Sequence, residues 1–119
     1  MHELSIALDI LDVAEEEAQR LCIKRVAAVH LKVGALSGVV PQALLSAYEL
    51  VCEGTILAGS QLVIEEVSVV IYCPRCQAER AAESIQCLCC EVCGTPAAEV
   101  VHGRELELSG LEIEELQPS

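Results

Sequence analysis

The sequence predicts an α+β fold: two helices on a three-stranded sheet, with a four-cysteine hairpin inserted before the last strand. Apolar residues recur at helical spacing in two segments, and three other segments alternate or are rich in β-branched residues. Six of the eight cysteines fall within residues 73–96, where apolar periodicity is weak. We therefore expect one domain made of residues 1–72 together with 97–119, and a second, inserted domain of residues 73–96.

The first half of the chain predicts helix, strand and helix in that order. Residues 3–22 predict an amphipathic helix because apolar residues recur at steps of three and four positions: Leu4, Ala7, Leu11, Ala14, Ala18 and Leu21. Residues 25–36 alternate apolar and polar side chains, which predicts a half-buried strand. Residues 41–53 predict a second helix, with Pro41 in its first turn and Gly54 as its stop.

The second half predicts one strand on each side of the cysteine-rich segment. Residues 61–72 are rich in β-branched types and lack glycine and proline. Residues 99–114 also predict a strand, and the two can pair as a long hairpin with residues 73–96 at its tip. A β-bulge at Ser109–Gly110 would turn two apolar pairs toward the core: Leu106 with Leu108, and Leu111 with Ile113.

The acidic composition makes nucleic acids and anionic membranes poor partners. The chain has 19 Asp and Glu against 7 Lys and Arg, a formal net charge of -12, and it lacks Phe and Trp. Phosphate backbones are bound by Lys and Arg, and bases stack on aromatic side chains. No apolar run reaches the roughly 18 residues of a membrane span, and the start lacks the basic segment of a signal peptide. We therefore expect a cytoplasmic protein that binds neither nucleic acid nor membrane.

The cysteine spacing predicts a closed metal site. Cys73 and Cys76 form one C-x-x-C pair, Cys90 and Cys93 form a second, and thirteen residues separate the pairs. In a reducing compartment such pairs indicate a metal site rather than disulfides. Four thiolates from two tight turns suit a tetrahedral structural zinc site, so we expect the inserted hairpin to be zinc-ribbon-like. Iron in a rubredoxin-like site is the rival metal.

The choice of the second pair has an alternative. Cys87 and Cys90 also enclose two residues, so Cys87 offers a competing ligand. Gly94 follows Cys93 directly and suits the exit of a tight turn, which favours Cys90 with Cys93. Cys87 and Cys89 are then spare thiols that could exchange as ligands.

The amino terminus offers a different kind of metal site. Because His2 is large, we expect Met1 to be retained with its α-amine. That amine, the His2 amide nitrogen and the His2 imidazole can close fused chelate rings, and the Glu3 amide can complete four nitrogens in a plane. Such a set suits Ni(II) or Cu(II). The plain alternative is a solvated chain end without a ligand role.

Four other potential ligands have simpler interpretations. We expect Cys22 and Cys52, near the predicted helix ends, to pack in the core as small apolar residues. His30 faces outward from the predicted first strand, and His102 lies near the start of the last strand. We expect both to be surface or packing histidines rather than ligands.

The order of these motifs resembles the HypA family, also called HybF, of nickel metallochaperones for [NiFe]-hydrogenase maturation. The resemblance spans essentially the whole chain. It rests on the start Met1-His2-Glu3-Leu4-Ser5, on Lys32-Val33-Gly34-Ala35-Leu36-Ser37, on Pro41 with Leu44, on Tyr48-Glu49, and on the two C-x-x-C pairs. Tyr48 stands where the family usually has Phe, and Cys87 and Cys89 are additional.

The resemblance implies a carrier rather than an enzyme. It implies that Met1, His2 and Glu3 bind Ni(II), with the His2 imidazole indispensable. It implies that the four paired cysteines hold a structural Zn(II): Cys73, Cys76, Cys90 and Cys93. The implied partners are the nickel-binding GTPase HypB and the hydrogenase large subunit, and some relatives also serve urease. The implied fold is an α+β nickel-binding domain with a zinc hairpin between its last two strands.

Two other classes of function compete with this interpretation. A zinc-ribbon module for protein–protein interaction, without nickel transfer, explains the cysteine pairs but not the amino-terminal motif. A redox enzyme with a C-x-x-C pair is disfavoured because both pairs lie in one hairpin rather than near a βαβ unit. The sequence allows a monomer or a dimer, including one with exchanged strands.

Overall fold

The computed structural model describes residues 3–116 and divides the chain into two compact units. The first unit contains the residues up to Leu31, the segment Val39–Glu65 and the residues from Leu108 onward. The second contains Lys32–Gly38 and Glu66–Glu107. Two strands, β1 (Ile23–Gly34) and β6 (Leu106–Leu116), each continue from one unit into the other.

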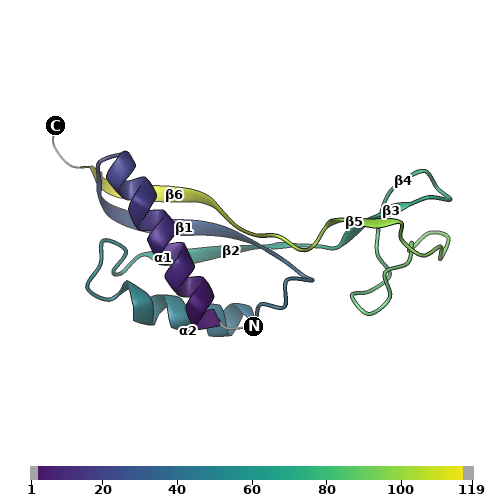
Figure 1. Cartoon of the computed structure of the whole chain (residues 1–119), viewed down its shortest axis with the longest axis horizontal. Coiled ribbons are helices and arrows are strands. Elements are labelled where there is room, and N and C mark those ends of the chain that lie inside the picture. Colours follow the sequence, from purple (N-terminus) through teal and green to yellow (C-terminus); the bar gives the residue numbers. More distant parts are fainter. Residues whose placement is uncertain (1–2, 117–119) are drawn as a thin grey trace. The chain divides into compact units, whose positions relative to one another are not determined.

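The first unit has two helices and a three-stranded sheet (Figure 1). The helices are α1 (Glu3–Arg20) and α2 (Pro41–Cys52), and they contact each other. The strand order is β2-β1-β6, with β2 over Gln61–Val67. The middle of the predicted apolar face of α1 is confirmed, because Ala7, Leu11, Ala14 and Ala18 are buried, whereas Leu4 and Leu21 at its ends are 49% and 46% exposed. The largest fully buried side chains of this unit are Tyr48, Leu31, Leu44, Leu57, Val26 and Val29. The prediction of two helices on a three-stranded sheet is confirmed.

The second unit has a three-stranded sheet of its own, which the sequence did not predict. Its order is β4-β3-β5, with β3 over Val70–Cys73, β4 over Ala78–Ala81 and β5 over Glu99–His102. Both pairings are antiparallel, and the β3–β5 register shifts between Val70 and Ile71. A small core holds the sheet together: Val69, Ile71, Cys73 and Cys90, with partly buried neighbours that include Leu36, Leu88 and Val100.

Both strands predicted beside the cysteine segment are interrupted. The strand expected over residues 61–72 breaks between β2 and β3, and the one expected over 99–114 breaks between β5 and β6. The long hairpin is therefore correct only for β3 and β5, because β1 lies between β2 and β6. At both breaks the backbone forms hydrogen bonds with the last residue of β1 and with the two residues that follow it. These bonds are Gly34 N–H to Glu105 O at 2.7 Å, Ala35 N–H to Val67 O at 3.0 Å and Leu36 N–H to Gly103 O at 2.6 Å.

Two further predictions about core packing are wrong. Leu106 and Ile113 are 39% and 48% exposed, so a bulge does not bring both apolar pairs of β6 to the core. We attribute this to the position of β6 at an edge of its sheet, where a side chain has fewer neighbours. Cys22 is also exposed, because it lies in the turn after α1 with a left-handed φ of 57°. Cys52, by contrast, is buried as predicted.

None of the described helices is both long and apolar enough to cross a membrane.

Candidate metal centre

The structure brings four thiols together at one end of the β4-β3-β5 sheet. The Sγ atoms of Cys73, Cys76, Cys90 and Cys93 all lie within 4.8 Å of one another. Cys73 and Cys90 are buried, while Cys76 and Cys93 are partly exposed. Thiols from two segments of the chain therefore converge, and two of them, Cys73 and Cys90, belong to the small core of the second unit.

The spacing of these sulfur atoms fits a tetrahedral zinc ion. A Zn–S bond of about 2.3 Å places the sulfurs of a regular tetrahedron about 3.8 Å apart. The Sγ of Cys93 lies 3.5 Å from that of Cys73 and 3.7 Å from that of Cys76. The Sγ atoms of Cys76 and Cys90 lie 4.0 Å apart. The donor set and these three distances therefore fit a tetrahedral Zn(II) site.

The first cysteine pair is held by the β3–β4 turn. Cys73 is the last residue of β3 and pairs with Ala78, the first residue of β4. The backbone N–H of Cys76 points back to the Cys73 sulfur, with N and Sγ 3.4 Å apart. Gln77 closes the turn with a φ of 52°, a region that residues with a Cβ seldom adopt. Sequence reasoning missed this role because glutamine carries no turn signal.

The second pair is held by a turn that ends in glycine. Gly94 N–H donates to Cys90 O at 2.8 Å, and Cys90 N–H donates to Thr95 O at 2.8 Å. Val92 N–H points to the Cys90 sulfur at 3.4 Å. Gly94 has a φ of 77°, as expected for the residue that ends a tight turn after Cys93. Backbone N–H groups directed at sulfur favour the thiolate form that a metal requires.

Neighbouring groups set the protonation of the two partly exposed ligands. Hydrogen bonds with Thr95, first from its side chain and then from its backbone, lower the pKa of Cys93 to about 6. The pKa of Cys76 is raised to about 11, first by its hydrogen bond with Cys93 and then by that with Cys73, while Arg80 acts in the opposite direction. Four thiols this close together do not all ionise, so some stay protonated until a metal cation binds and displaces their protons. Thr95 and Arg80 were not predicted; no cysteine spacing identifies such supporting groups.

The two spare thiols lie outside this cluster. Cys87 and Cys89 are partly buried, and their Sγ atoms lie 3.1 Å apart. The structure thus pairs Cys90 with Cys93 in the four-thiol group, as the position of Gly94 favours, and leaves Cys87 with Cys89.

The amino-terminal motif is only partly described. Met1 and His2 lie outside the described residues. Glu3 begins α1, and its Oε2 accepts a hydrogen bond of 3.4 Å from Val40 N–H. The other two histidines are surface residues, as predicted. His30 Nε2 lies 3.3 Å from Glu112, and His102 Nδ1 lies 2.9 Å from Glu105.

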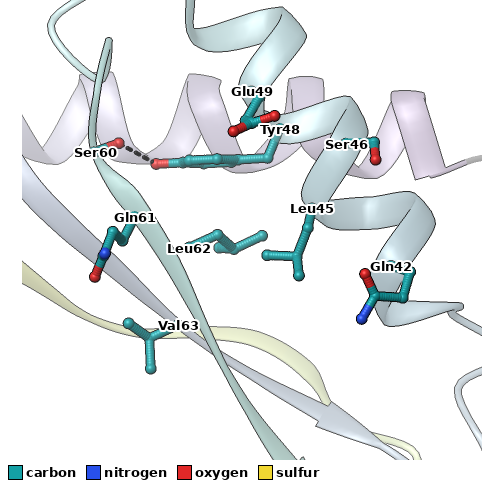
Figure 2. Close-up of a pocket in the computed structure, with 9 residues that line it drawn as sticks. All are labelled: Gln42, Leu45, Ser46, Tyr48, Glu49, Ser60, Gln61, Leu62 and Val63. Carbon is teal, nitrogen blue, oxygen red and sulfur yellow. Dashed lines mark hydrogen bonds between the residues drawn. The ribbon is translucent and has the colours of Figure 1, made fainter.

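We interpret the shallow pocket between α2 and β2 as a structural feature rather than a reactive site. Figure 2 shows the Tyr48 hydroxyl directed at Ser60, with the two oxygens 2.6 Å apart. The Ser60 hydroxyl in turn bonds to Leu57 O. Burial raises the pKa of Tyr48 well above its ordinary value, so the phenol stays protonated even in alkaline solution. Glu49 is the one carboxylate among the lining residues, which include Gln42 and Gln61.

The sequence matches a family model over residues 1–113, and that family is described as hydrogenase/urease nickel incorporation, metallochaperone, HypA. Several curated relatives are named hydrogenase maturation factor HypA. A relative from Chloroflexus aurantiacus is 48% identical over 94% of this chain and 98% of its own length. A relative from Roseiflexus is 42% identical over 99% of this chain and 96% of its own.

Solved structures support the same fold. The solution structure of the Ni metallochaperone HypA from Helicobacter pylori aligns with a TM-score of 0.67 at 24% identity. It covers 95% of this chain and 97% of that one. A second HypA solution structure aligns with a TM-score of 0.70 at 23% identity. By its match over nearly the whole sequence and by its curated relatives, this chain belongs to the HypA family of nickel-incorporation metallochaperones.

Proposed function

We propose that this chain carries one Ni(II) ion on Met1, His2 and Glu3 and passes it on for [NiFe]-hydrogenase maturation. The observation that carries the proposal is membership in a nickel-incorporation family whose match includes these first residues. The chemistry of the donors supports nickel, because an amine, amide nitrogens and an imidazole can form the square-planar set that Ni(II) prefers.

We further propose that the four paired cysteines hold a structural Zn(II). Their sulfur spacing matches a tetrahedral site, and four protein ligands leave no open position for a substrate. Zinc would stabilise the small core of the second unit, since metal binding contributes directly to folding. In this proposal residues 73–96 form the zinc-binding domain, and residues 1–72 with 97–119 form the nickel-binding domain.

Delivery would proceed by ligand exchange, without turnover of a substrate. An exposed nitrogen site would let an incoming ligand set bind the ion before the carrier has fully released it. Protonation of His2 and of the α-amine would weaken nickel binding, because both must be deprotonated to act as ligands. Nickel affinity should therefore fall as the pH drops.

The proposed partners are the nickel-binding GTPase HypB and the hydrogenase large subunit, in the cytoplasm. A monomer and a dimer with exchanged strands are both compatible with this role. The net charge of -12 disfavours nucleic acid as a partner.

A transfer experiment tests delivery. The zinc-loaded chain is charged with one equivalent of Ni(II), freed of excess metal and mixed with metal-free hydrogenase large subunit, with and without HypB and GTP. We expect nickel to appear in the large-subunit fraction from the parent and from a His30→Ala control, and to be absent with His2→Ala. Equal transfer by the parent and His2→Ala would overturn the proposed carrier site.

A zinc-ribbon interaction module is the second candidate. It is favoured by two apolar side chains exposed on the second unit, Ile85 at 51% and Val92 at 66%. A parent chain that binds zinc but no nickel would support this candidate over the carrier.

A further inference from the structure

Cys87 and Cys89 form a close thiol pair outside the four-cysteine cluster. Their Sγ atoms are 3.1 Å apart, whereas a disulfide bond is about 2.05 Å long. Both side chains are partly buried, so they retain access to small solutes. They lie in the loop that follows β4 (Figure 1).

The backbone holds the two thiols on the same side of a tight turn. Cys89 N–H donates to Cys87 O at 2.8 Å across Leu88, which is the hydrogen bond of a γ-turn. The inner residue is anchored, because Leu88 packs on the small core and its carbonyl accepts from Ala97 N–H at 2.9 Å. With Leu88 packed on the core, the Cys87 and Cys89 sulfurs lie side by side, 3.1 Å apart.

The rest of the loop fixes this turn at its base. Ser84 and Cys87 exchange two backbone hydrogen bonds of 3.3 Å, and the Ser84 hydroxyl accepts from Cys87 N–H at 3.0 Å. Glu83 N–H donates to Cys89 O at 2.9 Å. The pair is therefore preorganised by the hydrogen bonds of its own loop.

We propose that Cys87 and Cys89 are a reversible dithiol–disulfide site, oxidised by a low-molecular-weight disulfide. The thiolate of one cysteine attacks the small disulfide, forms a mixed disulfide and releases one small thiolate. The second cysteine then attacks the protein sulfur of that mixed disulfide, closes the Cys87–Cys89 bond and releases the second small thiolate. The protein loses two hydrogen atoms, and one small disulfide becomes two small thiols.

Two features of the neighbourhood act in opposite directions on disulfide exchange at this pair. The pKa of Cys87 is raised, first by its hydrogen bond with Cys89 and then by burial, and Glu83 acts in the same direction. A raised pKa lowers the thiolate fraction and so slows the first attack on any oxidant. The short distance between the two sulfurs speeds closure of the mixed disulfide once it has formed. Oxidation would fix the segment that leads directly into Cys90.

Equilibration with glutathione tests the proposal. The zinc-loaded full chain is held at graded ratios of oxidised to reduced glutathione, trapped with iodoacetamide and mapped by peptide mass spectrometry. We expect alkylation of Cys87 and Cys89 to be lost together, with loss of two hydrogen atoms and no loss of zinc. Cys87→Ser and Cys89→Ser should instead accumulate one glutathione adduct on the remaining thiol, and Cys22→Ser should behave as the parent.

Three results would overturn the proposal. In the first, Cys87 and Cys89 each carry a separate glutathione and never join. In the second, the internal disulfide includes one of the four clustered cysteines, such as Cys90, and zinc is released. In the third, both thiols remain open to iodoacetamide at the most oxidising ratio. Zinc content of each serine variant shows that it has folded.

Discussion

The Sγ atoms of Cys73 and Cys93 lie 3.5 Å apart, although twenty positions separate the two residues in the chain. Cys73 comes from the end of β3, and Cys93 comes from the glycine-ended turn. A bound divalent cation would tie these two segments together directly. Without it, four thiols converge in a unit whose apolar core is small, so the second unit should depend on metal for its stability.

Cys73→Ser should therefore abolish tight zinc binding and unfold the second unit. Structural zinc contributes about 10–16 kcal/mol of binding free energy in small zinc-dependent peptides, which exceeds what a core of this size supplies. Zinc content after dialysis against a chelator, and amide exchange of residues 66–107, measure both effects. Cys22→Ser is the control, because Cys22 is exposed and outside the cluster. Full zinc retention by Cys73→Ser would contradict the four-thiolate site.

Gly34→Ala should destabilise the fold although alanine usually favours ordered backbone over glycine. A Cβ at Gly34 would collide with the backbone of Gly103 and Arg104. Neither contact can move as a side-chain tip does, so we expect a cost of roughly 1–3 kcal/mol, typical of overpacking. Gly110→Ala is the matched control, since a Cβ there meets nothing within 4 Å. Chemical unfolding of both variants measures the difference, and equal stability would refute the close approach.

Glu105→Gln should destabilise the chain at neutral pH and have no effect in acid. Glu105 accepts a hydrogen bond of 2.6 Å from Gly103 N–H and faces His102 at 2.9 Å. The Gly103 bond first, and His102 second, hold the pKa of Glu105 below its usual value. The pKa of Glu105 is lower in the folded chain than in the unfolded chain, where a glutamate has a pKa of about 4.3. The ionised carboxylate therefore stabilises the fold above that pH, and this stabilisation is lost as the pH falls through the folded-state pKa.

The measurement is the difference in unfolding free energy between parent and Glu105→Gln from pH 7 to pH 3. Glu107→Gln, at an exposed neighbouring position, serves as control. A difference that stays constant across this range would contradict the role assigned to the carboxylate.

Tyr48→Phe should cost about 1 kcal/mol of stability, the usual value of one hydrogen bond, and leave metal binding unchanged. The ring stays buried, and Ser60 keeps its bond to Leu57 O when the phenol is lost. Leu44→Ala should cost more, about 2–5 kcal/mol, because it opens a cavity at a fully buried position. Thermal unfolding of the three proteins measures the order, and a loss of nickel binding by Tyr48→Phe would show that the pocket has a functional role.

Local patterns were sufficient to predict the helices and the four-thiol group. The α1 and α2 periodicities depend on residues three and four positions apart, and a C-x-x-C turn places two sulfurs without help from the rest of the fold. The end of α1 and the exposure of Cys22 were harder to predict, because a left-handed turn residue there is a cysteine rather than a glycine.

The second sheet could not be predicted from local patterns. Residues 61–72 and 99–114 each look continuous in sequence, and their breaks are set by backbone bonds to the segment from Gly34 to Leu36, far away in the chain. The same holds for Thr95 and Arg80 beside the cysteines, whose roles follow from packing rather than spacing. The close approach of Cys87 and Cys89 likewise depends on the inward anchoring of Leu88.

The most direct test of the account is a nickel titration of the zinc-loaded chain with an unmodified amino terminus. It is run beside His2→Ala, a variant with one residue added before Met1, and His30→Ala as a histidine control. We expect the parent and His30→Ala each to bind one equivalent of Ni(II), and the other two variants to lose this binding. Equal nickel binding by all four proteins would contradict the amino-terminal site and place the nickel elsewhere in the chain.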